Sequence, residues 1–216
     1  MEKDISKKST IKETFKLAIE SHQKNNLGVA EDLYCKILKI DPNHLAALNN
    51  LGVIFQILEK NQKARDCFEK AIALNPNYVD ALNNLGGMFQ RLEENQKAKD
   101  CFEKAITIDP NNINAFNNLG GLFQKLEEFQ KAKVYYEKAI TINPNYLPAI
   151  NNLGVVFQKL EEFQKAKVYY EKAITINPNY VEALNNLGVV FQKLEEFQKA
   201  KVCFEKAITI NPNYVD

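Results

Sequence analysis

The chain has 216 residues, of which 45% are hydrophobic and 25% are charged, so its composition is that of a globular protein and excludes a disordered one. Its 28 basic and 27 acidic residues give a formal net charge of +1, which argues against a nucleic-acid-binding or membrane-surface protein. No apolar run approaches the roughly 18 residues of a transmembrane helix, and residues 1–10 lack the apolar segment of a secretory signal, so we expect a cytoplasmic protein.

Proline and glycine recur along the chain with a spacing of 34 residues, which is typical of a solenoid or array of repeats. The regularly spaced prolines are Pro42, Pro76, Pro110, Pro144, Pro178 and Pro212, and the glycines are Gly52, Gly86, Gly120, Gly154 and Gly188. If each repeat ends two residues after its proline, the repeats are 11–44, 45–78, 79–112, 113–146, 147–180 and 181–214. We therefore expect a tail at 1–10, a single array over 11–214, and the start of a truncated further repeat at 215–216.

Each repeat is expected to contain two helices joined by a short turn, because the apolar residues of each half recur on one helical face. Each second helix is expected to end before an Asn-Pro or Asp-Pro dipeptide, since proline disfavours a helical conformation in the residue before it. Asparagines just before the first helices are the expected N-caps, as at Asn77, Asn145 and Asn179. Thr10 and Glu13 have the spacing of a capping box at the start of the array.

The turn between paired helices lacks the glycine that a left-handed backbone favours. The residues at this place are Asn25, Glu59, Glu93, Glu127, Glu161 and Glu195. If these positions adopt positive φ, each glutamate costs about 1 kcal/mol; alternatively, the helix continues and the turn shifts. Small residues at Gly86 and Ala98 are expected to let the two helices of a repeat approach closely.

The repeats resemble those of the tetratricopeptide repeat family, whose pattern is W-x₂-L-G-x₂-Y…A-x₃-F…P. The matching residues in 45–78 are Leu48, Leu51, Gly52, Phe55, Ala64, Phe68 and Pro76. The first repeat departs most, with Thr14, Ala18 and Ser21 where the others have an apolar residue, Gly and Phe. The resemblance implies an all-α, right-handed solenoid of six stacked helix-turn-helix repeats. It also implies that the first helices line a concave groove that binds extended peptides or partner segments, without catalysis or a cofactor.

Side-chain amides are concentrated on the expected polar face of the first helices. The paired asparagines are Asn49 and Asn50, Asn83 and Asn84, Asn117 and Asn118, Asn151 and Asn152, and Asn185 and Asn186. Further rows contain Gln56, Gln90, Gln124, Gln158 and Gln192, and Arg91, Lys125, Lys159 and Lys193. Because a primary amide offers donors and acceptors as a peptide unit does, we predict that these rows hold an extended peptide.

The second asparagine of each pair resembles the asparagine ladder of O-linked N-acetylglucosamine transferase repeat regions, which contacts the backbone of the substrate peptide. An alternative, compatible with this one, is that one asparagine of each pair bonds to a neighbouring helix and has a structural role. The carboxylate-clamp subset of the family, which grips an acidic C-terminus, is not matched, because asparagines stand where that pattern requires lysines and an arginine.

No other constellation of residues indicates chemistry. His22 and His44 have no metal-like spacing, the cysteines show no C-x₂-C motif, and no nucleophile–base set is apparent, so we expect neither an enzyme nor a metal site. The leading prediction is a protein–protein interaction scaffold. One alternative is the substrate-recruiting N-terminal arm of a larger, glycosyltransferase-like enzyme whose catalytic domain is missing. The other is a self-assembling structural array, with self-association through an uncapped C-terminal repeat that exposes Phe204 and Ile208.

Overall fold

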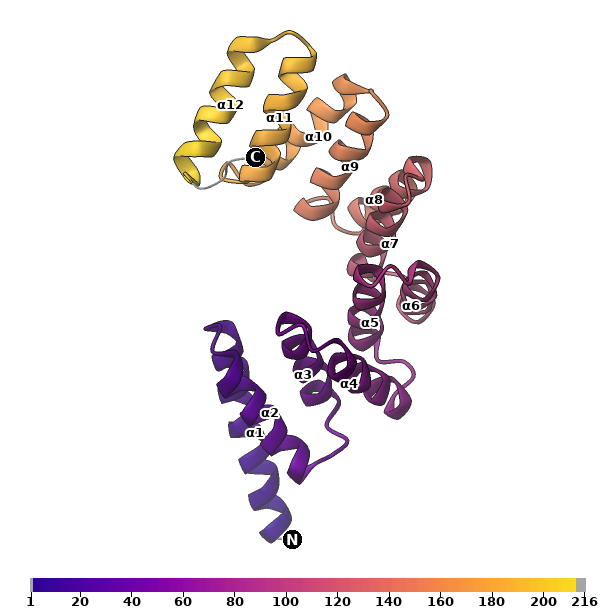
Figure 1. Ribbon diagram of the computed structural model, residues 1–216, viewed down its shortest axis with the longest axis vertical. Helices are drawn as coiled ribbons and strands as arrows, with labels where there is room; N and C mark the ends of the chain where they lie inside the picture. The colour runs from indigo at the N-terminus through magenta and orange to yellow at the C-terminus, as the bar shows by residue number, and fades with distance from the viewer. Residues whose placement is uncertain (1, 213–216) are drawn as a thin grey trace. The chain divides into compact units, whose positions relative to one another are not determined.

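The computed structural model describes residues 2–212 of the chain and the side chains of residues 9–212. Over this range the backbone forms twelve α-helices and no strands, which confirms the predicted all-α solenoid of paired helices (Figure 1). The helices are α1 (Glu2–Gln23), α2 (Leu27–Ile40), α3 (Leu45–Ile57), α4 (Asn61–Leu74), α5 (Val79–Arg91), α6 (Asn95–Ile108), α7 (Ile113–Lys125), α8 (Phe129–Ile142), α9 (Leu147–Lys159), α10 (Phe163–Ile176), α11 (Val181–Lys193) and α12 (Phe197–Ile210).

The predicted boundaries at the two ends of the chain have different outcomes. Helix α1 begins at Glu2, so residues 2–10, which the sequence places in a tail, continue the first helix of the first repeat. Thr10 therefore lies inside this helix and cannot be its N-cap, and its carbonyl oxygen accepts a hydrogen bond from the hydroxyl of Thr14 at 2.7 Å. The further repeat predicted to start at 215–216 lies outside the described residues.

The contacts between helices divide the chain into two compact units, Met1–Pro110 and Asn111–Asp216, each of which holds three helix pairs. In the first unit, α2 packs on α3 and α4 packs on α5; in the second, α8 packs on α9 and α10 packs on α11. The first helices of neighbouring repeats also touch within a unit, since α3 contacts α5, and α9 contacts both α7 and α11. Side chains of successive first helices can therefore interact directly.

In five of the six described helix pairs a glycine packs against an aromatic ring, and the first pair has Ala18 at this position. In the fourth repeat, a Cβ atom built on Gly120 would lie 2.6 Å from Cδ1 of Tyr136, which is closer than side chains pack. The same contact joins Gly52 to Phe68, Gly86 to Phe102, Gly154 to Tyr170 and Gly188 to Phe204. The prediction of close approach at Gly86 is thus confirmed, and Ala98 on the partner helix is fully buried.

The turn inside each helix pair adopts the left-handed conformation, which decides between the two alternatives that the sequence leaves open. Glu127 and Glu161 both have a φ of 58°, and the equivalent residues of the other repeats have φ between 57° and 63°. The backbone N–H of Glu128 donates to the carbonyl of Phe123 at 2.9 Å, and that of Glu127 to the carbonyl of Gln124 at 3.1 Å. This pair of bonds is a Schellman motif, which usually carries glycine where Glu127 stands.

The N-caps of the first helices lie one residue later than the sequence predicts. Tyr78, Tyr146 and Tyr180 occupy the cap position, and their side chains make no cap hydrogen bond. The expected caps are instead part of the preceding turn, where, for example, the backbone N–H of Asn145 donates to Oδ1 of Asn143 at 3.0 Å. Side-chain capping occurs at Asn112, whose Oδ1 accepts from the N–H of Ala115 at 2.9 Å.

Candidate functional site

The structure separates the two asparagines of each predicted pair. Asn49 is 6% exposed, and Asn83 and Asn151 are each 8% exposed, so these first asparagines are buried. Asn117 and Asn185 are half-buried, and so are all five second asparagines: Asn50, Asn84, Asn118, Asn152 and Asn186. Consecutive helical residues point about 100° apart, which turns the first asparagine toward the neighbouring helices and the second toward the surface.

Hydrogen bonds join the amides of successive repeats within each unit. Nδ2 of Asn84 donates to Oδ1 of Asn49 at 2.9 Å in the first unit. In the second unit Asn152 donates to Asn117 at 3.4 Å, and Asn186 donates to Asn151 at 3.3 Å. Asn49, Asn117 and Asn151 thus have the structural role that the sequence leaves open for one member of each pair. The second asparagines are held in place while their Oδ1 atoms are not used in these bonds.

Buried tyrosine hydroxyls form hydrogen bonds with the predicted glutamines and with one second asparagine, a feature that the sequence reasoning missed. The hydroxyl of Tyr136 donates to Oε1 of Gln124 at 3.0 Å, and that of Tyr170 donates to Oε1 of Gln158 at 3.1 Å. In the first unit the hydroxyl of Tyr34 accepts from Nδ2 of Asn50 at 3.1 Å. Burial raises the pKa of Tyr136 and Tyr170 well above its usual value, so both hydroxyls keep their protons.

The remaining predicted residues lie at or near the ends of the first helices. Gln90, Gln124 and Gln158 are half-buried in the last turn of α5, α7 and α9. Each of these helices ends in a cation, and the side chains of Arg91, Lys125 and Lys159 are exposed. We call the second asparagines and the glutamines together the amide row: Asn50, Asn84, Asn118, Asn152, Asn186, Gln56, Gln90, Gln124, Gln158 and Gln192.

Cations on the second helices cover the aromatic residues of the first helices and so connect successive repeats. The ring of Phe157 has Nζ of Lys133, from the preceding repeat, at 5.5 Å and Nζ of Lys165, from its own repeat, at 5.4 Å. Phe191 is likewise 5.2 Å from Lys167 of the preceding repeat. Lys167 also lies 3.6 Å from Glu196, so the face of α10 that carries this lysine is covered by the next repeat.

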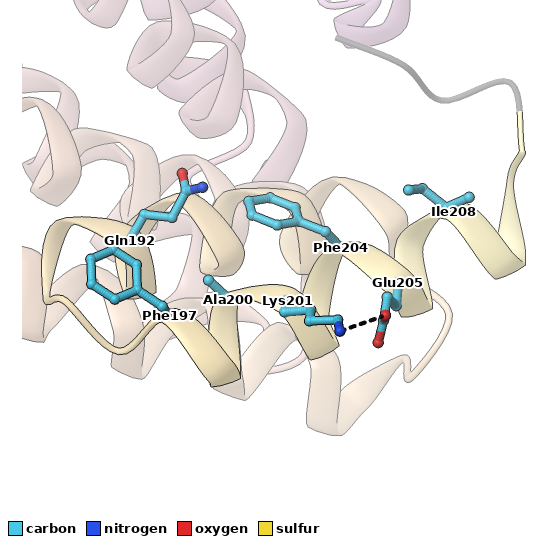
Figure 2. A pocket seen from close by; sticks show the side chains of 7 residues that line it. All are labelled: Gln192, Phe197, Ala200, Lys201, Phe204, Glu205 and Ile208. Carbon is cyan, nitrogen blue, oxygen red and sulfur yellow. Dashed lines mark ion pairs between the residues drawn. The ribbon is translucent and has the colours of Figure 1, made fainter.

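The same face of α12 forms an open pocket of about 340 Å³ (Figure 2). Its lining residues are Gln192, Phe197, Ala200, Lys201, Phe204, Glu205 and Ile208. Phe197 is 63% exposed and Ile208 is 53% exposed, whereas Phe163 and Ile174, one repeat earlier, are half-buried. Lys201 forms an ion pair with Glu205 at 3.8 Å on the same helix, where the equivalent Lys167 pairs with the next repeat.

No group of three or more His, Cys, Asp or Glu side chains among the described residues is placed to hold a metal ion. Across the described helices, none is both long enough and apolar enough to cross a membrane.

Comparison with known families identifies the repeats. Models of the tetratricopeptide repeat match residues 43–111, 113–146, 148–180 and 181–214, which together make up most of the chain. The chain belongs to the tetratricopeptide repeat family. Tetratricopeptide repeats are generally non-catalytic, and the assignment supports a scaffold for protein–protein interaction with protein partners. No curated protein matches the sequence.

Solved structures of other proteins share this fold. PilF of Pseudomonas aeruginosa is 22% identical with a TM-score of 0.82, over 96% of this chain and 95% of PilF. PilW, described as a type IV pilus biogenesis factor, is 23% identical with a TM-score of 0.84, over 95% of both chains. YrrB, described as a tetratricopeptide repeat protein with an unusual peptide-binding site, is 24% identical with a TM-score of 0.60, over 84% of this chain and 93% of YrrB.

Proposed function

We propose that this tetratricopeptide repeat protein binds an extended peptide or partner segment along the part of the amide row that lies within one unit. The observation that carries the proposal is the hydrogen bonding of Asn84, Asn152 and Asn186, each of which is tied to the preceding repeat through Nδ2. These half-buried amides are already ordered, so they lose little further conformational entropy when a ligand binds. A peptide backbone, with one donor and one acceptor per residue, is the ligand that such a row fits.

The buried first asparagines are positioning residues in this proposal. Asn117 and Asn151 accept from the second asparagines of the following repeat and hold them in place, and the peptide touches the second asparagines. The exposed cations Arg91, Lys125 and Lys159 lie beside the row and favour a ligand that carries acidic residues. YrrB, which shares the fold and is described as having a peptide-binding site, supports this function by analogy.

The test begins with a peptide selected from a random display library against the whole chain. Its affinity is measured by calorimetry for the wild type and for Asn152→Ala and Asn186→Ala. Each variant should bind about fivefold more weakly, as expected for one lost hydrogen bond. Gln130→Ala is the matched control, because it removes an exposed amide of α8 outside the row, and it should bind as the wild type does. Failure to select any peptide, or equal affinity for all variants, would contradict the proposal.

A second candidate function is self-association through α12, which the pocket in Figure 2 favours. We propose that its occupant is the α12 face of a second copy, related by a two-fold axis. Phe197, Phe204 and Ile208 would then pack against their own counterparts, and Lys201 of each copy would face Glu205 of the other. Helix α1 of a second copy is a poorer occupant of this face. It carries Glu20 and Ser21 at the positions equivalent to Val190 and Phe191, which are buried apolar residues of α11.

Sedimentation velocity over a range of concentrations tests this pairing. The wild type should form a dimer, and the double variant Phe197→Glu, Ile208→Glu should be monomeric. Leu17→Glu is the control on α1, where Leu17 is 53% exposed, and it should leave the dimer intact. Species that keep growing with concentration and are lost in Leu17→Glu would indicate head-to-tail stacking and overturn the two-fold pairing.

A further inference from the structure

We propose that the buried hydroxyls of Tyr136 and Tyr170 set the polarity of the glutamines in the unit Asn111–Asp216, so that Gln124 and Gln158 present N–H donors to the backbone of a bound peptide. The asparagines of the row, which Asn117 and Asn151 orient, present oxygen acceptors. The inference rests on the proposed function and deepens it. Two buried tyrosines, which no ligand can touch, would then determine which groups of the row form hydrogen bonds with the ligand.

The argument starts from the single proton of a phenol group. The hydroxyl of Tyr136 uses that proton to donate to Oε1 of Gln124 at 3.0 Å, while Nδ2 of Asn152 donates to Oδ1 of Asn117 at 3.4 Å. A donor must meet the oxygen of an amide, and an acceptor must meet its nitrogen. The two amides are therefore oriented oppositely, with Nε2 of Gln124 and Oδ1 of Asn152 left for a ligand.

The next repeat shows the same polarity. Tyr170 donates to Oε1 of Gln158 at 3.1 Å, and Nδ2 of Asn186 is turned inward to Oδ1 of Asn151 at 3.3 Å. From α7 to α11 the row thus runs donor, acceptor, donor, acceptor. Helices in contact lie about 8–10 Å apart, and an extended chain advances about 3.1–3.4 Å per residue. Each repeat would therefore meet about three peptide residues and bond to one carbonyl and one N–H among them.

Repeats with phenylalanine in place of the tyrosine provide the internal comparison. Phe68 stands at this position in the first unit, where no hydroxyl can meet Gln56. Nε2 of Gln56 donates instead to the backbone carbonyl of Asn84 at 3.2 Å, which leaves Oε1 as the free group. The polarity of this glutamine is opposite to that of Gln124 and Gln158. The choice between Tyr and Phe therefore correlates with the group that the glutamine offers.

The first experiment needs no ligand. Hydrogen exchange of the side-chain NH₂ groups is measured by NMR in the wild type and in Tyr136→Phe, a substitution that should fold because three repeats carry Phe68, Phe102 or Phe204 at this place. In the variant, Nε2 of Gln124 should turn to the backbone carbonyl of Asn152, as Nε2 of Gln56 does to that of Asn84, so the NH₂ of Gln124 should exchange about fivefold more slowly. Tyr135→Phe is the matched control, since the Tyr135 ring stacks on Phe123 at 5.3 Å. Unchanged exchange at Gln124 in Tyr136→Phe overturns the proposal.

The second experiment uses the peptide selected against the whole chain, with single backbone carbonyl oxygens replaced by sulfur, a weaker hydrogen-bond acceptor. On the wild type, a thioamide should weaken binding severalfold at positions about three residues apart, where Gln124 and Gln158 donate. On the double variant Tyr136→Phe, Tyr170→Phe this positional dependence should disappear. An identical thioamide profile on both proteins overturns the inference and leaves the proposed function standing. If no peptide is selected, the proposed function fails, and the exchange measurement alone decides the polarity.

Discussion

Gly86 and Phe102 approach each other so closely that no side chain fits between them. A Cβ atom on Gly86 would lie 2.6 Å from Cε1 of Phe102, whose ring is fully buried. A Cβ atom on Gly87, the next residue of α5, would meet no atom within 4 Å. One helix therefore contains a glycine that the packing requires and one that it does not.

This difference predicts opposite effects for two neighbouring substitutions. Gly86→Ala should lower the free energy of unfolding by about 1–3 kcal/mol, because the ring of Phe102 must be displaced in a packed core. Gly87→Ala should raise it by about 0.5–1 kcal/mol, since alanine restricts the unfolded chain and favours the helix. Urea unfolding of both variants checks the prediction, which fails if the two alanines have the same effect.

The glutamates with positive φ are a second place where a substitution should stabilise the fold. Glu127 and Glu161 both have a φ of 58°, a conformation that costs a residue with a Cβ atom about 1 kcal/mol or more. Glu127→Gly and Glu161→Gly should each stabilise the protein by about 1 kcal/mol, and the effects should add. Glu171→Gly, in the interior of α10, is the control and should destabilise it by a similar amount. Thermal unfolding that shows no gain for the first two variants would contradict the account.

Periodic features of the fold could be predicted from the sequence, and features that depend on a neighbour could not. A glycine at the position of Gly86 and an aromatic residue at that of Phe102 recur in every complete match to the repeat pattern, so the helix pairs and their close packing follow from the spacing. The N-cap is misplaced by one residue because Asn143 and Asn145 form a turn with each other, which competes with capping. An asparagine at either position thus suits both a turn and an N-cap, and the sequence alone does not distinguish them.

The asparagine pairs show a different limit. A helical wheel places Asn83 and Asn84 on one polar face, yet Asn83 is buried, because the first helix of the neighbouring repeat contributes to its surroundings. Tyr136 and Phe102 are equivalent in an apolar pattern, so the hydroxyl that reaches Gln124 carries no signal at the level of periodicity. The occurrence of Tyr in some repeats and Phe in others was the only sequence feature that could have indicated it.

Alkaline pH should destabilise the fold through the buried tyrosines. Burial raises the pKa of Tyr136 and Tyr170 above the ordinary value of 10.0, so the unfolded chain loses these protons first. The stabilisation is complete below that pH and is lost as the pH rises through 10. Burial also raises the thiol pKa of Cys67 and Cys101 to about 11, so the loss begins near pH 9.

Urea unfolding between pH 8 and pH 11 measures this dependence. The double variant Tyr136→Phe, Tyr170→Phe should lose stability less steeply above pH 10 than the wild type. Tyr135→Phe should follow the wild type. Equal slopes for the wild type and the double variant would show that these two hydroxyls do not carry the effect.

The most direct test of the amide row is to observe its side chains while a peptide binds. The ¹⁵N–¹H signals of the side-chain amides are followed by NMR as the selected peptide is added to the whole chain. The account predicts that the largest shifts occur at Asn152, Asn186, Gln124 and Gln158, and that exposed amides of the second helices, such as Gln130 and Gln164, stay unchanged. Shifts confined to the second helices or to the turns between repeats would contradict the claim that the peptide lies along the amide row.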